Sequence, residues 1–123
     1  PNPPPPPPTH PQGLGRRQRQ MCIRDSVMKY NLEEVPELLA DIAGAMGADI
    51  AGMDSLNAGK TAVDEMQRLS KKIGLSQRLR DLGVEVDTLK ECSELSMSDG
   101  SIIYNPKIIM DAEEVFAVYE EAY

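Results

Sequence analysis

The sequence predicts an all-α fold over residues 27–123, and three observations support this prediction. Apolar residues recur there at i, i+3, i+4 and i+7, the spacing that lines one face of a helix. Glycines and short polar residues that favour helix ends interrupt the pattern at helix-length intervals. Alternation of apolar and polar residues, which would indicate half-buried strands, is scarce.

The first two helices are predicted from apolar faces that end at a glycine. Gly47 ends the first helix and Gly74 ends the second, since glycine is favoured just beyond a helix C-terminus. Asp54 or Ser55 is expected to cap the second helix. The first face comprises Leu32, Val35, Leu38, Leu39, Ile42 and Met46, and the second comprises Ala62, Met66, Leu69 and Ile73.

Shorter elements are predicted in the second half of the chain. A helical turn at residues 79–82 is closed by Gly83, and Asp87 and Asp111 are placed to cap two further helices. Between those helices, residues 99–107 form a loop with a short extended stretch of two isoleucines and a tyrosine. The inward faces comprise Leu89, Cys92 and Leu95 or Ser96 in the first helix, and Val115, Phe116, Tyr119 and Ala122 in the second.

Residues 1–26 differ in composition from the rest of the chain. They carry a proline run at residues 3–8, four arginines and one acid, whereas the whole chain has a net charge of −7. One interpretation is a polyproline II ligand for an SH3 or WW domain, and another is a disordered tail. A third, which we prefer, is that the string QRQMCIRDS is translated sequencing-adapter read-through. Residues up to Ser26 would then be non-native, with a boundary before Val27.

Composition also limits the classes of partner. The acidic residues are concentrated in the helical part, which makes nucleic acid and anionic membranes unfavourable partners. No stretch is long and apolar enough to span a membrane. The two cysteines, Cys22 and Cys92, show no CxxC spacing, and this usage is typical of a reducing cytoplasm.

Few residues offer catalytic chemistry. His10 is the only histidine, so no imidazole metal site and no Ser/His/Asp or Cys/His set forms unless the tail folds over the helices. The string AGKTA at residues 58–62 lacks the first glycine of a phosphate-binding loop, because position 54 is Asp54, and is interpreted as the exposed start of a helix. Cys92 is expected to be a small apolar core residue. No residue is therefore assigned as catalytic, cofactor-binding or metal-binding.

The most distinctive stretch is IGLSQRLRDLGV at residues 73–84. Its Arg78 and Arg80 can clamp an anion or pair with Asp81, and pairing within the chain is the more common outcome. The stretch resembles the IGxPxxLRDLGV motif near the C-terminus of iron-containing alcohol dehydrogenases, with Ser76 where that family usually has proline. Four more segments resemble family motifs in the same order: VMKYN at 27–31, ADIAGAMG at 40–47, DGS…NP at 99–106 and DAEEV at 111–115.

This resemblance implies that residues 27–123 are the C-terminal part of the helical domain in the fold shared by dehydroquinate synthase and iron-containing alcohol dehydrogenases. Family members pair this domain with an N-terminal α/β domain that binds NAD(P), and an Asp and three His hold iron between the two. The metal-binding histidines precede VMKYN, where this chain has Asp25 and Ser26 in place of a Pro-His pair. The chain alone is therefore expected to bind neither metal nor nucleotide and to be inactive.

The intact enzyme would use Fe²⁺ or Zn²⁺ and NAD(P) for reversible hydride transfer between an alcohol or aldehyde and the nicotinamide. Its implied partners are the missing N-terminal part of the same enzyme, a small alcohol or aldehyde, and further copies in a cytoplasmic homo-oligomer. Ser101 stands where many members have a cysteine that lines the substrate cavity, so Ser101 is the one candidate for contact with substrate. Lys107 replaces the arginine that follows Asn-Pro in the family.

Two alternatives stay open. A stand-alone helical interaction module, with the proline-rich segment as an SH3 or WW ligand, would fold cooperatively as a monomer. A dehydroquinate-synthase-like relative of the same architecture fits the LRDLGV and NP strings less well.

Overall fold

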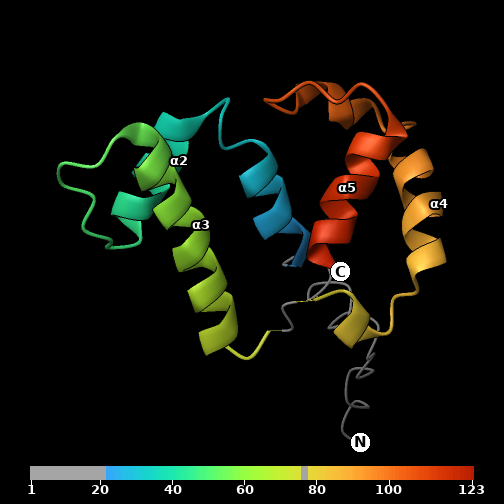
Figure 1. The fold of residues 1–123 in the computed structure, drawn as a ribbon, viewed down its shortest axis with the longest axis horizontal. Helices are drawn as coiled ribbons and strands as arrows, with labels where there is room; N and C mark the ends of the chain where they lie inside the picture. Colours follow the sequence, from blue (N-terminus) through green and yellow to red (C-terminus); the bar gives the residue numbers. More distant parts are fainter. Residues whose placement is uncertain (1–21, 76–77) are drawn as a thin grey trace, which may run out of the picture.

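The computed structural model describes residues 22–75 and 78–123, which form helices and loops with no strand among them (Figure 1). The all-α prediction is confirmed. A helix at residues 22–30 comes first and continues through the boundary predicted between Ser26 and Val27. The labelled elements that follow are α2 (Pro36–Ala45), α3 (Ser55–Lys72), η1 (Arg80–Leu82), α4 (Val86–Ser96), η2 (Gly100–Tyr104) and α5 (Ala112–Ala122).

Side-chain caps begin α3 and α5 as predicted. The Asp54 carboxylate accepts a hydrogen bond of 2.9 Å from the backbone N–H of Asn57. The Asp111 carboxylate accepts bonds of 3.0 Å from the backbone N–H groups of Glu113 and Glu114. These bonds satisfy donors that the first turn of a helix otherwise leaves unpaired.

The residues that end the helices are predicted correctly, whereas the capping residue predicted for the start of α4 is wrong. Glu85 precedes α4 without a capping hydrogen bond, so the predicted cap at Asp87 is wrong. Asp87 lies in the first helical turn instead, where a carboxylate interacts favourably with the helix dipole. Gly47, Gly74 and Gly83 have φ angles of 85°, 75° and 71°, which confirms them as left-handed residues just past helical segments.

The helices form two pairs, with the helix at residues 22–30 between them. α2 packs against α3 and α4 packs against α5, while the first helix lies between the pairs (Figure 1). This helix contributes Cys22 and Ile23 to one core and Met28 to the other. The buried residues are Cys22, Leu79, Leu89 and Ala122 in the first core, and Leu32, Leu39, Ala43 and Ala62 in the second.

The AGKTA segment is more buried than predicted. Ala58, Gly59 and Ala62 are buried, and Gly59 contacts residues of α2 and the preceding loop, whereas Lys60 is exposed. The prediction of an exposed helix start is therefore wrong, because the missing side chain of Gly59 lets the two segments approach closely. The segment lies inside a helix, which agrees with the rejection of a phosphate-binding loop.

Parts of the predicted inward faces are exposed. Leu38, Leu69 and Ile73 are between 44% and 62% exposed, so their predicted burial is wrong within this chain. Of the alternatives Leu95 and Ser96, Leu95 is 63% exposed and Ser96 is half-buried. Periodicity identifies the helix correctly, but an apolar face is buried only where another element covers it. The predicted extended stretch at residues 102–104 is also wrong, since these residues belong to the 3₁₀-helix η2. None of the described helices is both long and apolar enough to cross a membrane.

Candidate functional site

The loop around η2 carries Ser101, the residue that the sequence nominates for contact with a substrate. The Asp99 carboxylate begins this turn by accepting a 2.9 Å hydrogen bond from the backbone N–H of Ser101. Hydrogen bonds from the backbone and side chain of Ser101 lower the pKa of Asp99. The turn ends at Asn105, whose backbone N–H donates to the carbonyl of Ile102 at 3.1 Å. Ser101 is thereby held on an exposed helical turn.

Two asparagines connect this loop to the first helix. The Asn31 amide donates to Oδ1 of Asn105 at 2.9 Å, and the Asn105 amide donates to Oδ1 of Asn31 at 2.8 Å. Asn31 Oδ1 also accepts from the backbone N–H of Lys107 at 3.1 Å. We call this set of bonds the asparagine clamp. It joins residues 74 positions apart in the sequence, so it fixes a tertiary relationship rather than a local turn.

A second set of contacts supports the far end of the same loop. Glu114 Oε2 accepts from the Tyr30 hydroxyl at 3.3 Å and from the backbone N–H of Met110 at 2.8 Å. The Lys107 ammonium lies 4.5 Å from the centroid of the Tyr30 ring, a cation–π geometry. Desolvation and the nearby Glu114 charge raise the pKa of Tyr30, which keeps its hydroxyl a donor.

Four large apolar side chains of the loop point into solvent. Ile103, Tyr104, Ile108 and Met110 are each at least 75% exposed, and we call them the apolar loop face. Single exposed apolar residues are common, whereas a contiguous apolar patch marks a surface that another element covers.

The described residues do not fit a metal ion. They contain no group of three or more His, Cys, Asp or Glu side chains that could hold one. Asp25 is buried with one carboxylate oxygen unpartnered, and the adjacent Ser26 offers only a hydroxyl. Desolvation raises the pKa of Asp25 although Lys29 and Arg24 lower it, so this carboxylate is poorly stabilised as an anion. No metal-dependent step is assigned to these residues, and His10 lies outside the described part of the chain.

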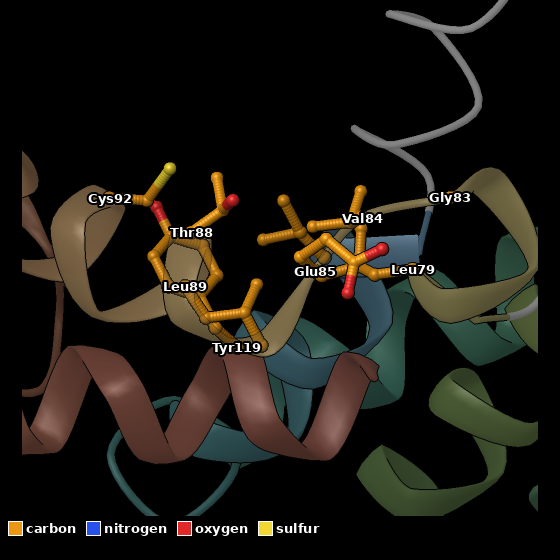
Figure 2. A pocket seen from close by; sticks show the side chains of 9 residues that line it. Leu79, Gly83, Val84, Glu85, Thr88, Leu89, Cys92 and Tyr119 are labelled. Carbon is orange, nitrogen blue, oxygen red and sulfur yellow. The ribbon is translucent and has the colours of Figure 1, made fainter.

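A separate cavity of 270 Å³ is lined by residues of α4 and α5, by residues that flank η1, and by Ile23 of the first helix (Figure 2). Cys92 and Thr88 of α4 line it together with Glu85 and with Tyr119 of α5. Cys92 is half-buried, so the prediction of an apolar core position is only partly met. No histidine lies among the described residues to activate its thiol.

The arginine stretch has a structural role at one of its two positions. The Arg78 guanidinium donates to the backbone carbonyl of Glu121 at 2.7 Å, near the C-terminus of α5. A cation there also interacts favourably with the helix dipole. Arg80 is exposed on η1, and Ser76 of the same stretch lies outside the described residues.

Comparison with known proteins identifies the family. A model described as "Fe-containing alcohol dehydrogenase family, C-terminal" matches residues 21–123. The chain belongs to the iron-containing alcohol dehydrogenase family. Its match begins at residue 21, ahead of the boundary predicted at Val27.

Relatives in this family are several times longer than the chain. A 1,3-propanediol dehydrogenase of Klebsiella pneumoniae is 38% identical over 97 residues, which are 79% of this chain and 25% of that protein. A lactaldehyde reductase of Escherichia coli strain K12 is 29% identical over 97 residues, again 79% of this chain and 25% of that protein. The chain therefore spans about a quarter of the length of the curated relatives it matches.

Solved structures agree with this assignment. The crystal structure of a 1,3-propanediol oxidoreductase matches with a TM-score of 0.79 and 36% identity, covering 84% of this chain and 27% of that one. An alcohol dehydrogenase from Oenococcus oeni matches with a TM-score of 0.78 and 25% identity, with the same coverage. The observed helices are therefore those of the C-terminal helical region of this family.

The asparagine clamp is the feature that sequence reasoning missed. Asn31 closes the VMKYN string and Asn105 opens the Asn-Pro string, so both lie in segments that resemble family motifs. Nothing in the spacing of the two motifs indicates that their asparagine side chains meet.

Proposed function

We propose that this chain is the closing part of the helical domain of a metal-dependent, NAD(P)-linked alcohol dehydrogenase. In the proposed reaction an alcohol loses a hydride to the nicotinamide and a proton to the surroundings, giving the aldehyde, and the reverse reaction reduces the aldehyde. The observation that carries the proposal is the family match over residues 21–123, with 38% identity to a 1,3-propanediol dehydrogenase.

The part assigned to this chain is to form one wall of the substrate cleft. Ser101 is the proposed contact to the alcohol or aldehyde, because it stands on the exposed turn of η2 at the position that resembles the family's cavity cysteine. The ligands of Fe²⁺ or Zn²⁺ and the NAD(P) site belong, in this proposal, to the part of the enzyme that precedes VMKYN.

Two structural features support a missing partner segment. The apolar loop face is exposed in this chain, and so are Leu38, Leu69, Ile73 and Leu95 on the helices. The match spans only 25% of the length of the matched relative. The remaining part of that relative is therefore about three times as long as the matched segment, and it can cover such surfaces. We propose that the missing N-terminal part of the same enzyme covers these side chains. The isolated chain should then bind a hydrophobic dye, and a dye-silent, cooperatively melting monomer would argue against this account.

A fusion enzyme tests the proposed function. Residues 27–123 would replace the matched segment of the Klebsiella pneumoniae 1,3-propanediol dehydrogenase, and NAD-dependent oxidation of 1,3-propanediol would be measured. We expect turnover from the fusion and none from the isolated 123-residue chain or from the host enzyme truncated before the matched segment. A folded, iron-loaded fusion without turnover would contradict the proposal.

The remaining assignments are also proposals. We propose that residues 1–26 are non-native, that the intact enzyme is a cytoplasmic homo-oligomer, and that neither nucleic acid nor membrane is a partner. The proline run at residues 3–8 lies outside the described residues. The comparisons give no support to a stand-alone interaction module. Finding QRQMCIRDS in the genomic reading frame would refute the non-native tail.

A further inference from the structure

The asparagine clamp uses both the donor and the acceptor of two side-chain amides. Each amide of Asn31 and Asn105 both donates to and accepts from the other, at 2.9 Å and 2.8 Å. The Asn105 amide also donates to the carbonyl of Lys107 at 2.6 Å, and Asn31 accepts from the N–H of the same residue. A carboxylate in either position would lose its donor and face an oxygen of its partner.

Because the clamp is buried, water cannot easily replace its hydrogen bonds. Asn31 is only 7% exposed and Asn105 is half-buried. Loss of the Asn105 amide leaves the buried Asn31 NH₂ without its acceptor, while Asn31 Oδ1 keeps its bond from the N–H of Lys107. An unpaired buried donor is more costly than the loss of an exposed bond.

The loop that the clamp holds has little packing of its own. Ser101, Ile103 and Tyr104 of η2 are exposed, and of its side chains only Ile102 is half-buried. The position of η2 relative to the first helix therefore depends strongly on polar contacts at its end, and the clamp lies directly at that end.

We propose that Asn31 and Asn105 are positioning residues that hold the substrate-contacting turn of η2 in register with the helix at residues 22–30. This inference rests on the proposed function, in which Ser101 faces the alcohol and residues 27–30 of the first helix follow directly after the metal-binding segment. A loop displaced by about an ångström would weaken alcohol binding and misalign it for hydride transfer.

The structural half of the proposal is tested in the chain itself. Hydrogen exchange of amides 99–107 would be measured in the wild type, N105L and N31D, with N57L as a matched asparagine replacement on α3. The side-chain amide of Asn57 bonds locally in the described contacts, to its own helix cap Asp54 at 2.5 Å. We expect exchange in the loop to rise roughly tenfold in N105L, less in N31D, which keeps both acceptor bonds, and not at all in N57L. Unchanged loop exchange in N105L would overturn the proposal.

The functional half is tested in the fusion enzyme with the same variants. We expect KM for 1,3-propanediol to rise roughly tenfold in N105L, with a smaller rise in N31D, while KM for NAD and iron content stay unchanged. A purely structural role would lower the amount of active enzyme without changing KM for the alcohol. An active parent whose variants keep the parental KM would overturn the positioning role and leave the proposed function intact. A metal-loaded parent without turnover would overturn the proposed function and the positioning role together.

Discussion

Gly59 of α3 faces Leu32 so closely that a β-carbon at position 59 would lie 2.7 Å from Cδ1 of Leu32. The same β-carbon would lie 3.3 Å from the carbonyl oxygen of Pro36 and 3.3 Å from Cβ of Leu39. The leucine side chain can rotate, but the backbone oxygen cannot give way without moving the start of α2. Glycine therefore lets these segments pack at this distance without displacing Leu32 or the start of α2.

Gly59→Ala is expected to destabilise the chain by about 1 kcal/mol. Overpacking costs about 1–3 kcal/mol and is partly offset by about 1 kcal/mol of improved helix propensity. Gly44→Ala is the matched control, because a β-carbon there would meet only Ile50, at an ordinary 3.6 Å. We expect this control to be neutral or up to about 1 kcal/mol more stable. Urea denaturation of both variants checks the prediction, which fails if Gly59→Ala is as stable as Gly44→Ala.

Asp111→Ala is expected to lower the free energy of unfolding by about 1 kcal/mol, because two N–H groups of α5 lose their acceptor. Asp111→Asn keeps an oxygen in the same place and should retain most of that stability. Thermal or urea denaturation distinguishes the two variants. Equal losses in both would show that the charge, and not the capping acceptor, matters.

The lowered pKa of Asp54 predicts that the fold loses stability in acid. Hydrogen bonds from the backbone and then the side chain of Asn57 lower the pKa of Asp54. A group whose pKa is lowered by folding stabilises the fold above its unfolded pKa of about 3.9, and this contribution disappears as pH falls through the folded value. Asp54→Asn should therefore show a smaller fall in unfolding free energy between about pH 5 and pH 2 than the wild type. Parallel pH profiles would contradict this assignment.

The contribution of Asp25 to stability is expected to change with pH in the opposite direction. Burial raises its pKa, so its contribution is most favourable below the unfolded pKa and is lost as pH rises through the folded value. At neutral pH the charged, partly unpartnered carboxylate is a liability. Asp25→Ala should raise stability at pH 7 by about 1 kcal/mol and gain less at low pH. A loss of stability at pH 7 would mean that the carboxylate has a partner in solution.

Local rules of sequence predict the starts of α3 and α5 and the glycines that follow α2, α3 and η1, whereas Leu32 and Val35 of the first predicted helix lie outside α2. Asp54 and Asp111 cap helices, and Gly47, Gly74 and Gly83 adopt left-handed conformations, because these preferences depend on the nearest few residues alone. The family resemblance was also carried by short strings in the correct order, and the family assignment is confirmed.

The same local rules do not predict contacts between residues that are far apart in the sequence. Leu38 and Leu95 have helical spacing but are exposed, since periodicity shows that a face exists and not that this chain covers it. The burial of Gly59 is not predictable from its own segment, because its contacts are made by residues far away in sequence. The bonds between Asn31 and Asn105 also join residues 74 positions apart, and no local rule predicts them.

Sequencing the genomic locus across and upstream of codons 20–30 tests the central proposal most directly. The account predicts that the reading frame reaches VMKYN through a Pro-His pair in place of Asp25 and Ser26, with an Asp and further histidines upstream. It also predicts an N-terminal α/β domain ahead of them. A frame that encodes QRQMCIRDS immediately before VMKYN, with a start codon and no such domain upstream, would contradict it.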